Sequence, residues 1–205
     1  MKNSNKSRAI IIKTAKQLFE RYGFNKTSID DIAHHSHKAK GSIYYNFGGK
    51  IELFKIVVEE ELEHIKKELS LIVESHNVTR SGPEQLIEYM MRRMELFNNA
   101  LVYKQILSQP YQRQDYEASD IANLIREPFD RWERTYFQYI CEEGIKQQVL
   151  ESSANPESFS DMLCMILRGL EYQFFSKGDY EKSKETFEYF VESLIYNMVK
   201  NKKTK

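Results

Sequence analysis

Cysteine, glycine and proline are scarce in this chain. Its 205 residues include two cysteines, eight glycines and four prolines. Two cysteines are too few for a disulfide framework, so we expect Cys141 and Cys164 to be buried, reduced thiols. The shortage of glycine and proline disfavours a sheet with many turns and favours helices.

Long apolar runs are absent as well. No segment approaches the roughly 20 residues that a membrane-spanning helix needs, and the N-terminus lacks the apolar stretch of a signal peptide. We therefore expect a cytoplasmic protein without membrane contact. With 41% hydrophobic and 29% charged residues, the composition is typical of a globular chain that builds its own core.

Acidic residues are rare at the start of the chain. Residues 1–50 hold ten basic residues and three acidic ones, a net charge of +7. The remaining residues hold twenty basic and twenty-seven acidic ones, a net charge of −7, so the formal charge of the whole chain is zero. A basic segment on an acidic body indicates a surface for a polyanion. A solvated lysine-rich terminus is the other interpretation that charge alone allows.

Three short helices are predicted in the first fifty residues. Apolar residues recur at helical spacing over residues 7–22, and Gly23 follows as a stop. Thr27 or Ser28 is the expected N-cap of a second helix of about two turns. A third helix is expected over residues 39–46. Three helices with a brief turn between the last two have the layout of a helix-turn-helix.

The rest of the chain predicts longer helices with apolar faces. Asn155 and Pro156 are the expected cap and first residue of one of them. The fold class is therefore all-α. The expected helices cover residues 50–76, 83–108, 127–147, 156–176 and 180–200.

The segment KGSIYYNF, residues 40–47, has the features of a helix that reads DNA. It has a cation at its leading end, a glycine that permits close approach, and a serine that can bond to a base or a phosphate. The hydroxyls of its two stiff tyrosines can reach phosphates, although half-buried packing is the alternative role for these rings. The predicted DNA-binding residues are Thr27, Ser28, Lys38, Lys40, Gly41, Ser42, Tyr44, Tyr45, Asn46 and Lys50.

Residues 8–54 resemble the DNA-binding domain of the TetR family, the tetracycline-repressor-like bacterial regulators. The stretch IIIKTAKQLFERYGFNKTSIDDIA follows the family outline ILxxAxxLFxxxGFxxTSIxDIA, and KGSIYYNFGGKIELF resembles the family's turn and third helix. The resemblance implies a homodimer with nine or ten helices in each chain. A three-helix helix-turn-helix domain, residues 1–50, would precede a larger helical domain, residues 51–205, for effector binding and dimerisation.

The resemblance also implies a function in transcription regulation. Such a protein binds a palindromic operator in double-stranded DNA, and a small effector in the larger domain releases the DNA. A repressor is the expected role. No motif specifies the operator, the regulated genes or the effector.

The turn before the third helix departs from the family pattern. The family usually has Ala-Gly-Val-Ser where this chain has Ser36, His37, Lys38 and Ala39. We expect His37 to adopt a positive φ that a glycine would adopt more easily. Ala39 cannot cap the third helix with its side chain, which costs that helix about 1 kcal/mol.

An effector pocket is expected among methionines and aromatic residues of the larger domain, with plain core packing as the alternative for each residue. We expect a bulky apolar or aromatic effector, because an acidic body is poorly suited to an anionic ligand. For Arg168 and Glu171, a polar role in the pocket and a position in solvent near the dimer contact both remain open. The candidate pocket residues are Met90, Met94, Phe97, Tyr103, Trp132, Tyr136, Phe137, Met165 and Tyr172.

The last two helices predict the dimer interface, because one chain has more apolar faces than its own core can cover. The candidate interface residues are Phe159, Leu163, Leu167, Leu170, Phe174, Phe187, Phe190 and Leu194.

Motifs for catalysis and metal binding are missing. The sequence has no phosphate-cradling glycine loop, no nucleophile elbow and no His-Glu-x-x-His helix. No cysteine or carboxylate completes a tetrahedral metal site with His34, His35 and His37. We therefore predict no enzyme activity, no cofactor and no metal. The alternative function is a helical interaction protein with only non-specific DNA affinity, which leaves the basic first segment unexplained.

Overall fold

The computed structural model describes residues 2–76, 82–108, 116–148, 150, 155–176 and 180–198, and all regular structure within them is helical. The predicted all-α class is confirmed. None of the described helices is long and apolar enough to span a membrane. In chain order the helices are α1 (Lys2–Tyr22), α2 (Ile29–Ser36), α3 (Lys40–Phe47), α4 (Lys50–His76), α5 (Gly82–Asn99), α6 (Leu101–Ser108), α7 (Tyr116–Lys146), α8 (Pro156–Ser176) and α9 (Tyr180–Met198).

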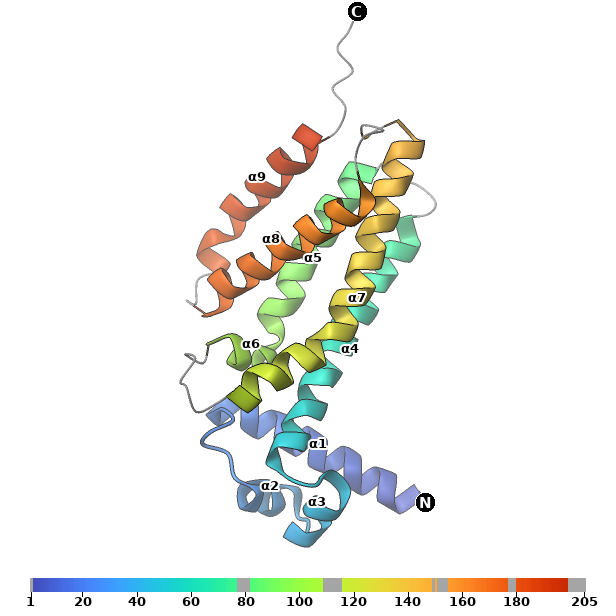
Figure 1. Cartoon of the computed structure of the whole chain (residues 1–205). Coiled ribbons are helices and arrows are strands. Elements are labelled where there is room, and N and C mark those ends of the chain that lie inside the picture. The colour runs from blue at the N-terminus through green and yellow to red at the C-terminus, as the bar shows by residue number, and fades with distance from the viewer. Residues whose placement is uncertain are drawn as a thin grey trace, which may run out of the picture.

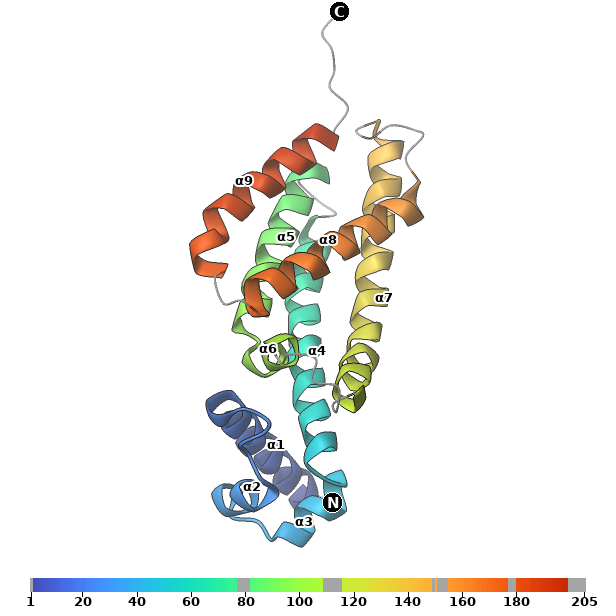
Figure 2. The same ribbon diagram turned by 60° about the vertical axis from the view of Figure 1, so that its left-hand side comes forward.

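The helices form two groups that α4 joins (Figure 1). The short helices α2 and α3 lie with α1 at one end of the molecule, and α5, α7, α8 and α9 form the other end (Figures 1 and 2). Between the groups, α6 packs against α1, α4 and α8. The domain boundary at residue 50 remains a prediction, because α4 runs from one group into the other without interruption.

Local interactions set the ends of the short helices. Gly23 has a φ of 82° after α1, as expected of a helix stop. Ser28 caps α2: its hydroxyl accepts the Asp31 N–H at 3.1 Å, and the Asp31 carboxylate accepts the Ser28 N–H at 2.9 Å. His37 has the predicted positive φ, 53°, and Ala39 precedes α3 without a side-chain capping bond. These features were all predictable from nearest neighbours in the sequence.

The single helix predicted over residues 83–108 is wrong, because the chain breaks at Ala100 into α5 and α6. Glu61 of α4 explains the break. Its carboxylate accepts the backbone N–H groups of Val102 at 3.4 Å and Tyr103 at 2.8 Å, which satisfies the N-terminus of a new helix. Apolar periodicity in residues 83–108 cannot reveal a cap that comes from another helix.

The helix predicted over residues 127–147 begins earlier, because α7 starts at Tyr116 and includes Pro128 in its interior. Proline removes one helical hydrogen bond and bends a helix, and α7 changes direction between its olive and yellow parts in Figure 1. The predictions for the last two helices are confirmed for α8 and, to Met198, for α9. The carboxamide oxygen of Asn155 accepts the Ser158 N–H at 2.9 Å, as expected of the α8 cap.

A cluster of aromatic rings holds α4 against α1 and the loop that follows α1. The Phe54 ring centroid lies 5.3 Å from that of Phe19 and 4.8 Å from that of Phe24. Such contacts fix the two helices at one angle. In the other half of the molecule Cys141 and Cys164 are buried free thiols, as predicted, and burial raises the pKa of Cys164 to about 12.

Candidate DNA interface and buried ion cluster

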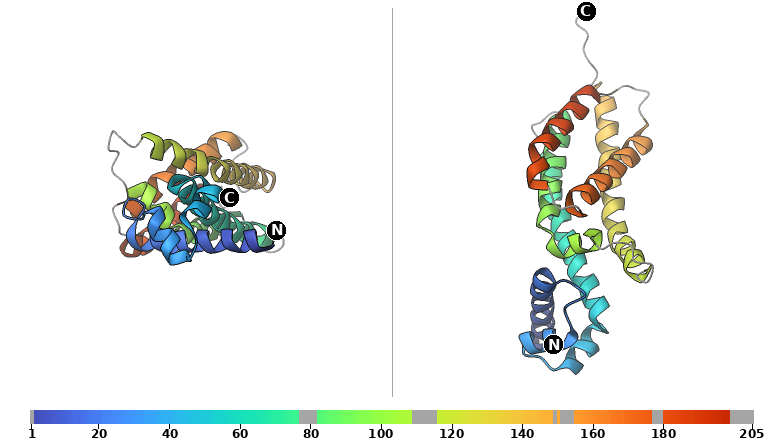
Figure 3. Two further views of the ribbon diagram at one scale, coloured as in Figure 1. Left: turned by 90° about the horizontal axis from the view of Figure 1, so that it is seen from below. Right: turned by 90° about the vertical axis from the view of Figure 1, so that its left-hand side faces the viewer.

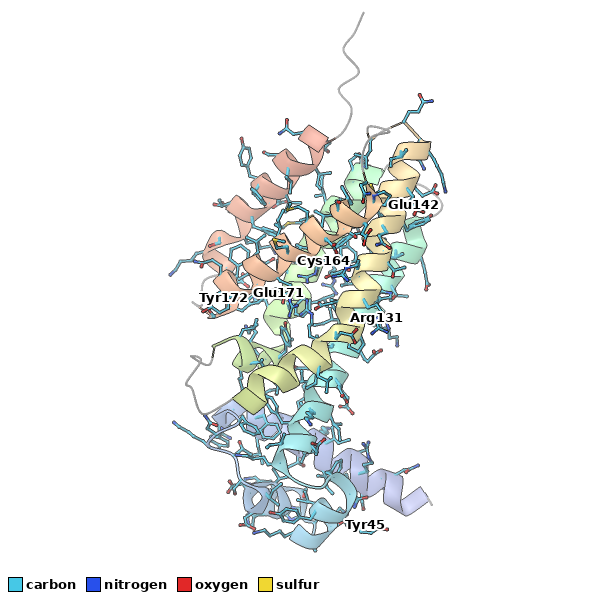
Figure 4. The ribbon with its side chains drawn as sticks, viewed as in Figure 1. Tyr45, Arg131, Glu142, Cys164, Glu171 and Tyr172 are labelled. Carbon is cyan, nitrogen blue, oxygen red and sulfur yellow. The ribbon has the colours of Figure 1, made fainter. Side chains whose placement is uncertain are left out.

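The helix α3 presents its two tyrosines to solvent. Tyr45 is 91% exposed and Tyr44 is 48% exposed, and Figure 4 places Tyr45 at the end of the molecule that α1, α2 and α3 form. Ile43 and Phe47 are buried on the opposite face. Gly41 is exposed, and a Cβ atom there would meet nothing within 4 Å. This face of α3 is open to a large partner.

Other residues predicted to bind DNA have partners within the protein. Thr27 is only 2% exposed, and its hydroxyl donates to the Gly23 carbonyl at 2.8 Å. Ser28 is the α2 cap. The Asn46 amide donates to the Ser42 carbonyl at 2.7 Å. In this protomer these polar groups hold the helix-turn-helix together.

The lysines that were predicted to bind DNA differ in how strongly other groups of the protein hold their ammonium groups. Lys40 is exposed and lies 2.9 Å from the Asp30 carboxylate, and the hydrogen bond that Lys40 donates to Asp30 raises the pKa of Lys40. The ammonium of Lys50 donates to the Phe24 carbonyl at 3.1 Å and lies 4.3 Å from the centroid of the Phe24 ring. Partial burial lowers the pKa of Lys50. Lys38 is half-buried. Lys50 therefore fastens α4 to the loop after α1.

Four buried charged residues from three helices form an ion cluster in the other half of the molecule. They are Arg93 of α5, Arg126 and Glu133 of α7, and Glu171 of α8, and each is at most 1% exposed. Arg93 donates to Glu133 through Nε at 2.5 Å and Nη2 at 3.0 Å. Arg126 donates to Glu171 through Nη1 at 3.0 Å and Nη2 at 2.9 Å. Arg93 also pairs with Glu171, which joins the two halves of the cluster.

Tyrosine hydroxyls and a phenylalanine ring complete the ion cluster. Tyr89 donates to Glu133 at 2.9 Å, and Tyr103 donates to Glu171 at 3.0 Å. The Phe97 ring lies 4.5 and 4.8 Å from the guanidinium carbons of the two arginines. Buried charges are tolerated when they are paired and hydrogen-bonded in this way.

The surroundings of Glu171, Arg93 and Arg126 favour the charged form of each. Burial would raise the pKa of Glu171, but the guanidinium groups of Arg126 and Arg93 outweigh it and lower that pKa to about 2. Burial would lower the pKa of Arg93, but the carboxylates of Glu133 and Glu171 outweigh it and raise that pKa. Two positive and two negative charges leave the cluster neutral.

Arg168 and Glu171, for which a position in the pocket and a position in solvent were both left open, differ in the structure. Glu171 lies inside the protein, where Figure 4 labels it, whereas Arg168 is 47% exposed and pairs with Asp130 at 3.0 Å. The Asp130 carboxylate also accepts from Nε of Arg126 at 2.7 Å. A chain of alternating charges therefore runs from the buried ion cluster to the surface between α7 and α8.

Sequence reasoning missed Arg93, Arg126 and Glu133, although a signal was present. Three of the four cluster residues lie four positions from buried apolar residues on both sides, which places them in the middle of an apolar face. The three series are Tyr89–Arg93–Phe97, Phe129–Glu133–Phe137 and Leu167–Glu171–Phe175.

The predicted pocket residues fall into two classes. Trp132 is half-buried, and Met165 and Tyr172 are 67% and 49% exposed. The hydroxyl of Tyr136 is buried without a hydrogen-bond partner in the described part of the chain. The interior members are Met90, Met94, Phe97, Tyr103, Tyr136 and Phe137.

Most residues predicted for the dimer interface pack against the core of the same chain. Leu163, Leu167 and Phe187 are at most 3% exposed. Phe159, Leu170, Phe174 and Leu194 are half-buried, and Phe190 is 43% exposed. The strongest apolar stripe of each helix covers its own core, and less apolar residues lie outward. The exposed apolar residues of α8 and α9 are Met162, Met165, Tyr172, Tyr189, Phe190 and Tyr196.

The short helix α6 contacts both groups of helices. Gln105 of α6 donates to the Phe19 carbonyl at 2.6 Å and accepts the Phe24 N–H at 3.0 Å. Two residues earlier, Tyr103 reaches the buried ion cluster. The cap of α6, Glu61, also pairs with Lys16 of α1 at 3.4 Å. A displacement in the ion cluster would therefore reach α1 through a single short helix.

The histidines of α2 and its turn lie at the surface. His34, His35 and His37 are exposed, and Nδ1 of His35 lies 2.8 Å from the Asp31 carbonyl. Over the described ranges, no three His, Cys, Asp or Glu side chains are grouped so that they could hold a metal ion.

Comparison with known proteins agrees with this arrangement. The profile of the family described as "Bacterial regulatory proteins, tetR family" matches residues 11–57, from α1 into α4. The chain is 29% identical over 193 residues to the "Probable HTH-type transcriptional regulator YttP" of Bacillus subtilis (strain 168), covering 92% of this chain and 88% of that protein. The chain carries a TetR-family DNA-binding domain. Its relatives are regulators and not enzymes, as predicted.

Solved structures share the fold of this regulator. A TetR-family transcriptional regulator from Pectobacterium atrosepticum has a TM-score of 0.76 at 18% identity, with 98% of each chain covered. A transcriptional regulator from Cytophaga hutchinsonii has a TM-score of 0.70 at 23% identity, covering 94% of this chain and 98% of that one. These likenesses extend the match beyond the helix-turn-helix to the whole chain.

Proposed function

We propose that this regulator is a repressor that binds a palindromic operator as a homodimer and releases it when a small, neutral, apolar or aromatic effector enters between α5, α7 and α8. The observation that carries the proposal is the position of α6. Tyr103 on this helix bonds to the ion cluster, and Gln105 bonds to the first helix group. An effector that moves the cluster has a direct route to the DNA-binding helices.

The ion cluster supports a neutral effector. Its two arginines and two glutamates already satisfy one another. A charged ligand would need to replace one of them, and breaking a buried ion pair costs about 3–5 kcal/mol. The surrounding apolar and aromatic side chains accept a neutral ring without that cost. The expectation from the sequence depended on the overall acidity of the larger domain. The pairing of the four buried charges is a more direct basis for a neutral effector.

The proposed coupling is a shift between two states of the dimer. Displacement of Tyr103 would move α6 and strain the two bonds of Gln105 to the backbone at Phe19 and Phe24. The angle between the two copies of α3 would change, and they would no longer fit successive major grooves. An effector achieves this only through a difference in affinity for the two states, typically about 1–3 kcal/mol.

A fluorescence titration tests the effector proposal. The operator is first selected from a random DNA pool. N-phenylnaphthylamine, a neutral aromatic probe, is then titrated while Trp132 emission and operator anisotropy are followed. We expect energy transfer from Trp132 and release of DNA over the same concentrations.

Anilinonaphthalene sulfonate is the matched control, because it has similar rings and one negative charge. We expect it to bind more weakly and to release less DNA. The effector proposal fails if the neutral probe binds without releasing the operator, or if a compound releases DNA and leaves Trp132 emission unchanged.

The proposed dimer contact is the outward face of α8 and α9. Met162, Met165 and Tyr172 line one side of α8, at a spacing that places them along a single stripe. Tyr189 and Tyr196 continue the apolar surface on α9. A second copy of this chain would cover both stripes in a two-fold contact, in which the same patch meets itself.

Met165→Lys should give a monomer by light scattering, because it places a charge at the centre of the proposed contact. Leu124→Lys is the matched control: Leu124 is 71% exposed on α7, outside the proposed contact, and this variant should stay dimeric. A Met165→Lys variant that remains a dimer would move the interface to another face.

A further inference from the structure

The first turns of α1 carry exposed basic residues that are not among the named residues predicted to bind DNA. No acidic residue precedes Glu20 in the sequence, whereas Lys6, Arg8 and Lys13 all lie in this segment. All three side chains are exposed. The positive charge of the first fifty residues is therefore concentrated on α1 as well as on the helix-turn-helix.

This basic surface lies beside α3, the helix that is proposed to read DNA. The guanidinium carbon of Arg8 is 5.2 Å from the ring centroid of Phe47, the last residue of α3. Figures 1 and 2 agree that the N-terminal end of α1 is level with α3 at the same end of the molecule. Seen from below in Figure 3, α1 crosses this end alongside the shorter helices. DNA that meets α3 therefore passes close to Lys6 and Arg8.

The cations of α1 have fewer ion pairs and hydrogen bonds with protein groups than the cations around α3. Lys40 is paired with Asp30, and Lys50 is bonded to the Phe24 carbonyl. Within the described part of the chain, Lys6 and Arg8 have no carboxylate at ion-pair distance. A phosphate that binds Lys40 must compete with Asp30, whereas a phosphate that binds Lys6 or Arg8 displaces only solvent and counterions.

We propose that Lys6 and Arg8 form a phosphate-binding arm that holds the DNA backbone next to the groove that α3 reads. The proposal rests on DNA recognition by α3. The ligand is the DNA phosphodiester backbone, and the arm adds affinity without reading bases. The contact of Arg8 with the Phe47 ring holds its guanidinium at the edge of α3, where the backbone flanking the groove would lie.

Salt dependence measures the arm directly. Dissociation constants of the full-length protein are measured at several salt concentrations, on an operator selected from a random pool and on a random duplex of equal length. Lys6→Ala and Arg8→Ala should each reduce the slope of log affinity against log salt by about one, on both duplexes. The double variant should lose about two.

Two control variants separate a phosphate contact from other causes. Lys146→Ala makes the same change in charge at the far end of α7, and its slope should equal that of the wild type. Arg8→Lys keeps the charge and should keep the slope, even if its melting temperature falls because the contact with Phe47 weakens.

The outcomes are distinct. Unchanged slopes in Lys6→Ala and Arg8→Ala overturn the arm, and so does weaker binding that follows a lower melting temperature at constant slope. If the wild type binds no selected duplex more tightly than the random one, the proposed operator function fails. The slopes on the random duplex would still decide whether the arm exists.

Discussion

Replacement of Glu171 by glutamine tests whether the buried ion cluster stabilises the fold. Glu171→Gln keeps the shape of the side chain and removes its charge. Arg93 would keep its pair with Glu133, and Arg126 would keep its pair with Asp130, which is partly exposed. Arg126 would lose its fully buried counterion.

The expected loss of stability follows from the cost of breaking a buried ion pair and from the lowered pKa of Glu171. Removing one partner from a buried ion pair typically costs about 3–5 kcal/mol. The lowering of the Glu171 pKa from 4.5 to about 2 corresponds to roughly 3 kcal/mol at about 1.4 kcal/mol for each pKa unit. We therefore expect Glu171→Gln to lower the free energy of unfolding by about 3 kcal/mol at neutral pH.

The same contribution should depend on acid pH. The folded pKa of Glu171 lies below its unfolded value, so the contribution is complete above pH 4.5 and is lost as the pH falls toward 2. Wild-type stability should decline across this window more than that of Glu171→Gln, and the difference between the two proteins should shrink.

Urea unfolding followed by Trp132 fluorescence measures both effects, at one fixed protein concentration because dimer formation adds to stability. Asp161→Asn is the matched control on the same helix. Asp161 and its partner Arg134 are each 50% exposed, and such surface pairs are worth about 0–1 kcal/mol. Equal effects of Glu171→Gln and Asp161→Asn on stability would contradict a stabilising role of the buried ion cluster.

Three further variants test other contacts. Gln105→Met removes the bonds of Gln105 to the Phe19 carbonyl and the Phe24 N–H and should cost about 1–3 kcal/mol of stability. N-phenylnaphthylamine should still bind to this variant but release less operator. Thr27→Val should lower the melting temperature, since this buried hydroxyl bonds to Gly23 and Leu18, but it should leave the salt slope of DNA binding unchanged. Tyr45→Ala should weaken operator binding severalfold without a change in melting temperature, because the side chain is 91% exposed.

Features that depend on neighbouring residues could be predicted from the sequence. The stop at Gly23, the cap at Ser28 and the positive φ of His37 each arise from interactions within a few positions, and the sequence shows all of the participants. The break at Ala100 could not be found in this way, because its cause, Glu61, is about forty positions away. The start of α7 was missed because its polar first turns read as a loop.

The role of a residue in the DNA interface could be predicted from the sequence where its side chain has only that one role. Tyr45 is an exposed residue of α3, as a DNA-reading helix requires. Lys50 and Thr27 have the right chemistry for DNA but are held by protein groups, which only the folded arrangement reveals. For the dimer, hydrophobicity alone favours Leu167 over Met165, although Leu167 is buried in its own core and Met165 lies outward.

The buried ion cluster constrains how α5, α7 and α8 can pack. Apolar side chains tolerate small rotations and shifts of a helix, because any apolar neighbour of suitable size will serve. Arg93, Arg126, Glu133 and Glu171 tolerate few, since a shift of one turn would leave a buried charge without its partner. The packing of these three helices therefore has few alternatives of low energy, and any alternative must rearrange several bonds together. Tyr103 belongs to that set of bonds and lies on α6, so a rearrangement that an effector stabilises would move α6 in a discrete step.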